Sequence, residues 1–128
     1  MVKTYQLMTR GVICVQTDTP VWEMMQLFDR HRVNNLPVVD GELHVIGLVN
    51  QFYLAACARL LADNNFQQRT AAEVMEHPVI CIDENDEISE VAWLIAHHGV
   101  DVLPVLRNGR LVGVVSRTDL IRLYAPVG

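Results

Sequence analysis

In this 128-residue chain, two cysteines and two histidines are the residues that first suggest a metal site. Cys14 and Cys81 stand 67 positions apart, and His31 and His98 have the same separation. Zinc ligands come from short spacings such as C-x-x-C or H-x(3–5)-H, and the sequence contains neither. The adjacent His97 and His98 would point about 100° apart on a helix. We therefore expect buried thiols and helix-end histidines, with no metal site.

A hydroxyl and a carboxylate stand three residues apart near the end of the chain, as Ser116 and Asp119. At the start of a helix this spacing predicts a capping box, in which each side chain accepts from the other residue's backbone N–H. Catalysis by Ser116 or Cys81 would need a base held beside it. The sequence contains no G-x-S-x-G, no P-loop and no G-x-G-x-x-G. We expect no catalytic residue.

The elements that position these side chains belong to an internal repeat. Residues 12–39 and 79–106 match without a gap at ten of twenty-eight positions, where average residue usage gives about two. The register extends to Met8 and Met75 and, after one extra residue in the first copy, to Gly47 and Gly113. The chain is therefore two copies of one unit of about sixty residues.

The sequence pattern of each copy predicts five secondary-structure elements in the order β-α-β-β-α. A short run rich in β-branched residues comes first, at 12–15 and 79–82. An amphipathic helix follows, two strands come next, and a second helix closes each copy at 50–61 and 116–124. The first helix has one apolar stripe at i, i+3, i+4 and i+7. The stripe residues are Val21, Met24, Met25 and Phe28 in the first copy and Ile88, Val91, Ala92 and Ile95 in the second.

Turn and cap residues indicate where these elements begin. We expect Thr19 and Asp86 to cap the two amphipathic helices. Tight hairpin turns are expected at Asp40-Gly41 and Asn108-Gly109. We expect Trp22 and Trp93 to pack in the core or between the copies.

Composition excludes several classes of protein. Hydrophobic residues make up 51% of the chain, so it is not a disordered tail. The formal net charge of −5 disfavours a nucleic-acid partner, and no apolar run approaches the ~18 residues of a membrane span. The start of the chain lacks a signal peptide, and three cysteines make no disulfide framework. We therefore expect a cytoplasmic protein.

The doubled unit resembles a tandem pair of CBS domains, a Bateman module, over about residues 4–60 and 68–124. The motifs that carry this resemblance are Leu7-Met8, Val33-x-x-Leu36-Pro37-Val38 and Val45–Val49 in the first copy, and Val74-Met75, Pro78–Ile82, Val100-x-x-Leu103-Pro104-Val105 and Leu111–Leu120 in the second. A unit this small buries its faces only with a partner. We expect an α/β fold of two β-α-β-β-α repeats packed with pseudo-twofold symmetry. Repeat 1 is 1–61, the linker 62–69 and repeat 2 70–128, in one intertwined module.

The resemblance implies a regulatory sensor that requires no cofactor. Its candidate ligands are AMP, ADP, ATP and S-adenosylmethionine, bound in the cleft between the repeats. In the family, the stretch that is Gly113–Asp119 here holds the ribose and the first phosphate, and adenine lies against nearby backbone. Thr70 stands where the family often has a threonine that touches the sugar or base. The ligand residues that the resemblance implies are Thr70, Ile80, Val100, Asp101, Ser116, Arg117 and Asp119.

The first copy departs from the family pattern. Asn50 takes the place of Ser116 and can still cap a helix, but Tyr53 replaces the carboxylate of Asp119. We therefore expect one site per chain, in the second copy. Nucleotide-binding members often place His-Arg directly before Leu-Pro, where this chain has Asn34-Asn35 and Asp101-Val102. An arginine that reached the phosphate, Arg117 or Arg32, would favour AMP or ADP over adenosine.

Assembly leaves alternatives open. CBS pairs commonly form flat homodimers through their amphipathic helices, and we expect a twofold homodimer here. The chain is then either a ligand sensor or a structural dimerisation module with a vestigial site. A third alternative is a fragment of a channel, kinase or synthase that the module regulates. An effector protein is an expected partner of the sensor.

Overall fold

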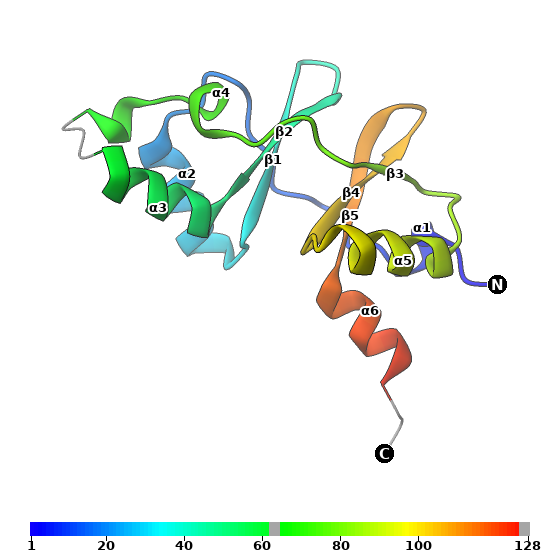
Figure 1. Cartoon of the computed structure of the whole chain (residues 1–128). Coiled ribbons are helices and arrows are strands. Elements are labelled where there is room, and N and C mark those ends of the chain that lie inside the picture. The colour runs from blue at the N-terminus through cyan, green and yellow to red at the C-terminus, as the bar shows by residue number, and fades with distance from the viewer. Residues whose placement is uncertain (62–64, 126–128) are drawn as a thin grey trace. The chain divides into compact units, whose positions relative to one another are not determined.

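The computed structural model describes residues 1–61 and 65–125 and divides the chain into two compact units (Figure 1). The first-repeat unit comprises residues 13–79, and the second-repeat unit comprises residues 1–12 together with residues from 80 onward. The segment before the first repeat thus folds with the second repeat, and the segment before the second repeat folds with the first. Residues 62–64 of the expected linker lie outside the described residues.

The first-repeat unit contains a two-stranded antiparallel sheet, β1-β2. Val15 adds a single parallel bridge to Val38, and Glu76 adds an antiparallel bridge to Leu48. The predicted strand at 12–15 is therefore reduced to one bridging residue. The elements of this unit are α2 (Val21–His31), β1 (Asn35–Val39), β2 (Val45–Asn50), α3 (Gln51–Leu61), the 3₁₀ helix η1 (Phe66–Gln68) and α4 (Ala71–Val74).

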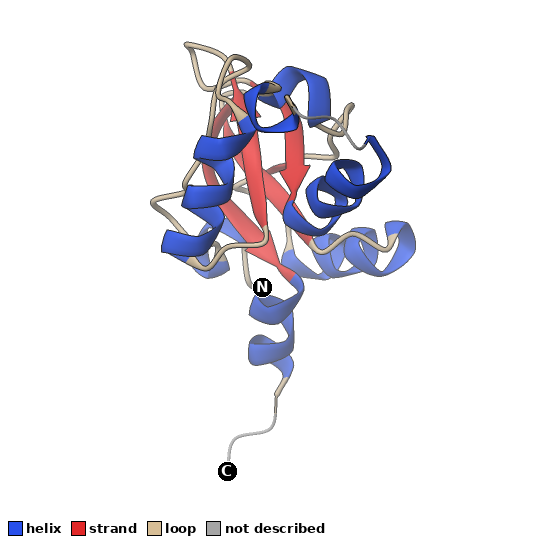
Figure 2. Ribbon diagram, turned by 90° about the vertical axis from the view of Figure 1, so that its left-hand side faces the viewer, coloured by secondary structure: helices blue, strands red, loops and turns tan. Residues whose placement is uncertain are grey.

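The second-repeat unit contains a three-stranded sheet in the order β3-β4-β5, with β3 parallel and β5 antiparallel to β4. Thr9 bridges Val114 of β5. The last helix, α6, continues from the end of β5 away from this sheet (Figures 1 and 2). The elements of this unit are α1 (Thr4–Leu7), β3 (Ile82–Asp83), α5 (Ile88–His98), β4 (Val102–Arg107), β5 (Arg110–Ser116) and α6 (Arg117–Tyr124).

Each unit has its own hydrophobic core, and the exchanged segments complete it. Met8 from the start of the chain is buried in the second-repeat core, and Phe66, Ala71 and Val74 are buried in the first-repeat core. The methionine of each exchanged segment packs on a strand glycine. A Cβ on Gly113 would lie 2.8 Å from the sulfur of Met8 and 2.9 Å from the carbonyl oxygen of Thr9. The repeat-equivalent Gly47 is crowded by Met75.

The amphipathic helices form as predicted, and most of each stripe is buried. Val21, Met24 and Phe28 of α2 lie in one core, and Ile88, Val91 and Ile95 of α5 lie in the other. Met25 is exposed. The tryptophans correct our expectation of core packing, because Trp22 is 41% exposed and Trp93 60% exposed. Each lies outside the apolar stripe of its helix.

Both expected caps of the amphipathic helices were wrong. The helix α2 begins one residue later than expected, with Pro20 at the N-cap position, and the Thr19 hydroxyl accepts instead from the backbone N–H of Gln16 at 3.0 Å. Glu87 occupies the N-cap position of α5, and the Asp86 carboxylate accepts from the backbone N–H of Asp83 at 2.9 Å. Both side chains stabilise the turn before the helix.

The two hairpins differ at their turns. Asn108 and Gly109, with φ of 50° and 79°, form the predicted two-residue turn between Arg107 and Arg110. The first hairpin has a longer loop, residues 40–44, and its left-handed residue is Leu43 with φ of 67° rather than Gly41. The expected tight turn at Asp40-Gly41 is therefore wrong.

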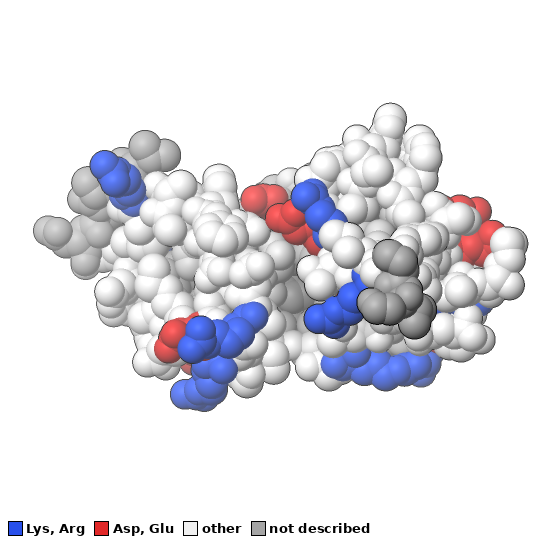
Figure 3. Space-filling model, turned by 90° about the horizontal axis from the view of Figure 1, so that it is seen from below, with Lys and Arg blue, Asp and Glu red and all other residues white. Residues whose placement is uncertain are grey.

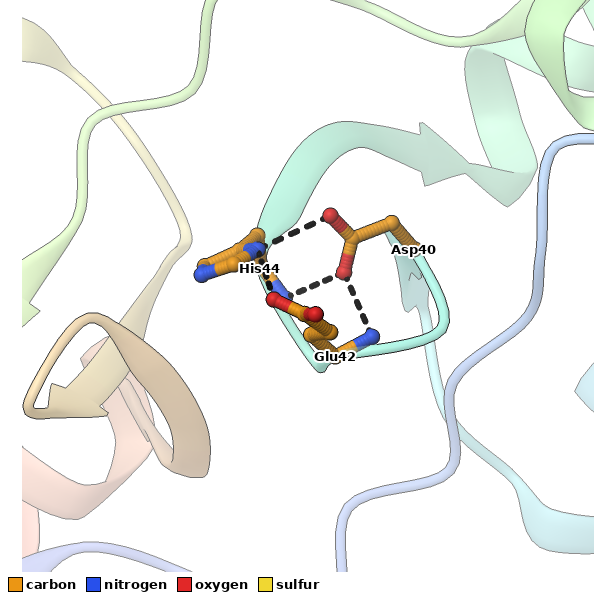
Figure 4. A network of polar contacts seen from close by, with 3 residues as sticks. All are labelled: Asp40, Glu42 and His44. Atoms are coloured by element: carbon orange, nitrogen blue, oxygen red, sulfur yellow. Dashed lines mark hydrogen bonds and ion pairs between the residues drawn. The ribbon is translucent and has the colours of Figure 1, made fainter.

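The Asp40 carboxylate holds the longer loop together (Figure 4). Its Oδ1 accepts from the backbone N–H groups of His44 at 2.9 Å and Glu42 at 2.8 Å. Its Oδ2 lies 2.9 Å from Nδ1 of the His44 ring. The hydrogen bonds from His44, first from its backbone and then from its side chain, lower the pKa of Asp40.

Candidate ligand-binding site

Ser116 and Asp119 form the predicted capping box at the start of α6. The Ser116 backbone N–H donates to Oδ2 of Asp119 at 2.8 Å, and the Asp119 N–H donates to Oγ of Ser116 at 3.2 Å. The Ser116 hydroxyl itself donates to the same Oδ2 at 3.0 Å. The serine hydroxyl thus acts within the cap both as a donor and as an acceptor.

The second oxygen of Asp119 is uncommitted. All of the carboxylate's hydrogen bonds from described residues go to Oδ2, so Oδ1 accepts none from them. The side chain is half-buried, and its position is fixed by the cap. A fixed carboxylate oxygen of this kind can accept hydrogen bonds from neighbouring hydroxyl groups of a ligand while the helix remains capped.

Val100, Asp101 and Arg117 meet beside this cap. The Arg117 backbone N–H donates to the Asp101 carbonyl at 2.9 Å, which ties the start of α6 to the residue before β4. Nη2 of Arg117 lies 3.2 Å from Oδ1 of Asp101 and 3.5 Å from the carbonyl oxygen of Val100. Both charged side chains are more than half exposed, so the ion pair contributes only about 0–1 kcal/mol to stability.

Ile80 lies toward the same end of the sheet. The strand β3 begins two residues after it and runs parallel to β4, so Ile80 comes before the edge at which β4 begins. Its side chain is 38% exposed. Five of the seven implied ligand residues therefore gather at one strand-to-helix junction, and Ile80 lies at that end of the sheet.

Thr70 belongs to the first-repeat unit, whereas the other six implied ligand residues belong to the second-repeat unit. Its backbone forms an antiparallel bridge with Pro20. Its hydroxyl donates to Oε1 of Glu73 at 3.2 Å, in the capping box of α4. The structure thus gives Thr70 a local structural role.

The equivalent junction of the first repeat is built from amides. Oδ1 of Asn50 accepts from the backbone N–H groups of Phe52 at 3.0 Å and Tyr53 at 3.1 Å, which confirms the expected cap. Nδ2 of Asn50 donates to Asn35 at 3.0 Å. No carboxylate stands at the Tyr53 position, so this junction offers no charged acceptor at the start of α3.

Cys14 and Cys81 are half-buried thiols. Burial raises the pKa of both, which keeps them protonated and weakly nucleophilic. His97 stacks on Trp93 with ring centroids 4.4 Å apart. Within residues 1–61 and 65–125, no group of three or more His, Cys, Asp and Glu side chains could hold a metal ion.

Charged side chains of both signs lie on the face of the molecule shown in Figure 3. On the face shown in Figure 3, Lys and Arg side chains form small groups with Asp or Glu beside several of them. In the part of the chain that the structure describes, no helix is both long and apolar enough to cross a membrane.

Sequence reasoning missed the pairing of Arg117 with Asp101. A hairpin with a two-residue turn at 108–109 places Asp101 opposite Ser116 if the register is simply counted back. A bulge in β5 shifts the register, since Leu106 pairs with Leu111 but Val105 with Gly113. The shift brings Asp101 level with Arg117. The signal in the sequence was that Asp101 and Arg117 have opposite charges and miss each other by one position in the simple register.

Comparison with known proteins agrees with the repeat. The CBS domain family model matches residues 2–65 and again residues 71–126. The L-aspartate semialdehyde sulfurtransferase of Methanocaldococcus jannaschii is 25% identical over 119 residues, which are 92% of this chain but 22% of that enzyme. The chain therefore spans about a fifth of the length of this relative.

Two solved CBS structures have the same fold. The CBS domain pair of protein MJ0100, in complex with 5′-methylthioadenosine and S-adenosyl-L-methionine, is 24% identical with a TM-score of 0.84, over 97% of this chain and 96% of that one. CBSX2, in complex with AMP, is 21% identical with a TM-score of 0.85, over 96% of each chain. The mixed α/β fold of two repeats is thus confirmed, and the chain belongs to the CBS domain family, with two CBS domains in tandem.

Proposed function

We propose that this CBS pair is a non-catalytic regulatory module that binds one adenosine-containing ligand per chain at the junction of β4, β5 and α6. The observation that carries the proposal is Asp119, whose Oδ2 caps α6 while Oδ1 is left for a ligand. A ribose presents two adjacent hydroxyl groups, which suit one ionised acceptor. Val100 and Asp101, tied to α6 by Arg117, supply the backbone against which adenine would lie.

The solved CBS structures support the class of ligand. Those structures are complexes with 5′-methylthioadenosine, S-adenosylmethionine and AMP, which share an adenosine group and differ at the 5′ position. The shared group is the part that Asp119 and the nearby backbone are suited to bind. AMP, ADP, ATP and S-adenosylmethionine therefore remain the candidates for this chain.

Mass spectrometry of small molecules released from the purified protein tests the proposal. We expect an adenosine-containing compound at about one per chain, and calorimetric titration with adenosine should give the same stoichiometry. Two adenosine molecules bound per chain would assign a second site to the first repeat. Absence of any bound or titratable adenosine compound would contradict the proposed function.

A regulatory module acts on a partner protein or on a catalytic domain. This chain spans only 22% of the sulfurtransferase relative, so the activity of that enzyme is not carried over to this chain. We propose that ligand binding is transmitted to another protein or catalytic domain. The reduced thiols Cys14, Cys57 and Cys81 fit the reducing conditions of a cytoplasm, which is the compartment we propose.

We also propose that the chain forms a twofold homodimer through its amphipathic helices. Trp22 and Met25 on α2 and Trp93 on α5 are exposed, although large apolar side chains of this kind are usually covered. Light scattering at tens of micromolar should give about twice the chain mass of 14.5 kDa. A mass equal to one chain would show that these side chains are not a dimer interface.

The second candidate function is a structural dimerisation module whose ligand site is vestigial. The observation that favours it is the first repeat, where Tyr53 has replaced the acid while the fold is retained. A stable dimer that binds no adenosine compound would establish this alternative.

A further inference from the structure

The exposed faces of the two amphipathic helices differ in shape. Each helix carries, beside its buried stripe, a second stripe at i, i+3, i+4 and i+7. Ala92 in these second stripes is partly buried, and the other residues are exposed. The α5 stripe holds one large ring among small side chains, whereas the α2 stripe starts with its ring and continues with longer side chains. The stripe residues are Trp22, Met25, Gln26 and Asp29 on α2 and Ser89, Ala92, Trp93 and Ala96 on α5.

These two stripes fit each other better than either fits a copy of itself. Two α2 helices packed antiparallel through this face would place Trp22 against the Asp29 carboxylate, and two α5 helices would leave Ser89 opposite Ala96, with small side chains on both sides. When α2 instead packs antiparallel on α5, each ring lies on a small side chain or on a methionine thioether, which is a favourable contact. The opposed pairs are then Trp22 with Ala96, Met25 with Trp93, Gln26 with Ala92 and Asp29 with Ser89.

Charged side chains beside the stripes favour the same arrangement. The first turn of each helix has an acid and the last turn a base, as Glu23 and Arg30 on α2 and Glu90 and His97 on α5. All four are exposed, and they lie on the same flank of their stripes. Equivalent flanks meet when two helices are antiparallel, so each acid of one helix faces the base of the other. Exposed pairs of this kind set orientation and register more than they add affinity.

We propose that α2 of one chain packs antiparallel on α5 of a second copy of this chain, with Trp22 on the partner's Ala96 and Trp93 on the partner's Met25. This α2–α5 pairing rests on the proposed homodimer and names the surfaces that meet in it. A twofold axis makes the contact twice, because the partner's α2 packs in turn on α5 of the first chain. The first repeat of each copy thus contacts the second repeat of the other.

Cross-linking between two single-cysteine variants tests the α2–α5 pairing. Gln26→Cys and Ala92→Cys chains are prepared separately, mixed, and treated with a thiol cross-linker that spans about 8–10 Å, the usual separation of packed helix axes. We expect a cross-linked dimer in the mixture and not in either variant alone, because the pairing places these two positions opposite each other in different chains. The original chain, treated in the same way, measures the background from its native cysteines.

The outcomes separate the pairing from the homodimer on which it rests. Cross-linking of Gln26→Cys alone, or a mixture that gives no more product than the original chain, would overturn the α2–α5 pairing if light scattering still gives a dimer. A mass equal to one chain would instead contradict the proposed homodimer.

An exchange of side-chain size tests the same contact without a reagent. Ala96→Trp adds a second ring where the partner's Trp22 lies, so the Kd of the dimer should rise about tenfold or more. Trp22→Ala in the same chain should restore most of the affinity, because it makes room for the new ring. Ala72→Trp, at an exposed position of α4, is the matched control and should leave the Kd unchanged. Circular dichroism checks that each variant is folded, and failure of Trp22→Ala to rescue Ala96→Trp would overturn the pairing.

Discussion

The strand-to-helix junctions of the two repeats share a backbone and differ in their side chains. Arg117 donates its backbone N–H to the Asp101 carbonyl at 2.9 Å, and Gln51 donates to the Asn34 carbonyl at 3.0 Å. The side chains of the same pairs form an ion pair in the second repeat and an amide–amide hydrogen bond in the first. Both junctions thus share the backbone hydrogen bond and differ in the kind of side-chain interaction beside it.

The caps differ in a more informative way. Asn50 caps α3 alone, with one oxygen that accepts from two backbone N–H groups. The cap of α6 uses two side chains, Ser116 and Asp119, and leaves a carboxylate oxygen over. Because one asparagine is sufficient to cap a helix, capping alone does not explain the acid at Asp119. This difference is our main reason to place the ligand in the second repeat.

The largest expected effect follows from removal of that acid. Asp119→Ala deletes an ionised acceptor of the ribose hydroxyls, so adenosine binding should weaken by about 2–4 kcal/mol, roughly thirtyfold or more. Calorimetric titration with adenosine measures the change. Tyr53→Ala, at the equivalent position of the first repeat, should leave the affinity nearly unchanged.

Loss of the cap must be separated from loss of the ligand contact. Asp119→Ala also removes part of the capping box, which costs about 1 kcal/mol of folding stability. Thermal unfolding without ligand measures this part alone. Normal adenosine binding by Asp119→Ala, together with weak binding by Tyr53→Ala, would place the site in the first repeat.

The equivalent strand glycines of the two repeats, Gly47 and Gly113, differ in the atoms that pack against them. Gly113→Ala would press its methyl group against the carbonyl oxygen of Thr9 as well as Met8, whereas the three atoms nearest to a methyl group at Gly47 all belong to the side chain of Met75. We expect Gly113→Ala to lower the free energy of unfolding by about 1–3 kcal/mol, and Gly47→Ala by less. Urea denaturation measures both.

A second substitution tests the cause of the glycine effect. Met75→Ala should recover part of the stability lost in Gly47→Ala, because it removes the crowding side chain. Met8→Ala should recover little in Gly113→Ala, because the Thr9 carbonyl remains. Equal losses in the two glycine variants would contradict this asymmetry.

The cap of the first repeat gives a smaller effect. Asn50→Ala removes the acceptor for two backbone N–H groups and should cost about 1 kcal/mol of stability. Adenosine affinity should stay the same, since no ligand contact is lost. A fall in affinity with stability unchanged would mean that the amide junction binds ligand.

Much of this architecture was predictable because it is encoded locally. The apolar stripes give α2 and α5, the spacing of Ser116 and Asp119 gives the cap, and Asn108-Gly109 gives its turn. The repeat itself could be found from identities alone. These features depend on residues that are close in the sequence.

Features set by distant residues were not predictable in the same way. The exchange of Met8 into the second-repeat core depends on packing across the whole chain. The pairing of Asp101 with Arg117 depends on one bulged residue in β5. The exposed Trp22 and Trp93 were misassigned because size and hydrophobicity alone suggest burial, while their helical position turns them outward.

The hairpin turns provide the last and smallest test. The turn of the second repeat, Asn108-Gly109, contains no ionisable side chain, whereas the loop of the first is held by Asp40. The pKa of Asp40 is lowered by hydrogen bonds from His44, so the folded state binds the proton of Asp40 less readily than the unfolded state. Its contribution to stability is therefore full above the unfolded pKa, about 3.9, and is lost as the pH falls through the lowered pKa of the folded state. Thermal unfolding of the original chain and of Asp40→Asn should show the original more stable at pH 6, and this difference should begin to shrink near pH 4 and disappear only when the pH is below the lowered pKa of Asp40 in the folded state. Asn108→Ala should change stability by an amount that does not vary over the same range, and a stability difference for Asp40→Asn that stayed constant with pH would show that the carboxylate's charge plays no part in the loop.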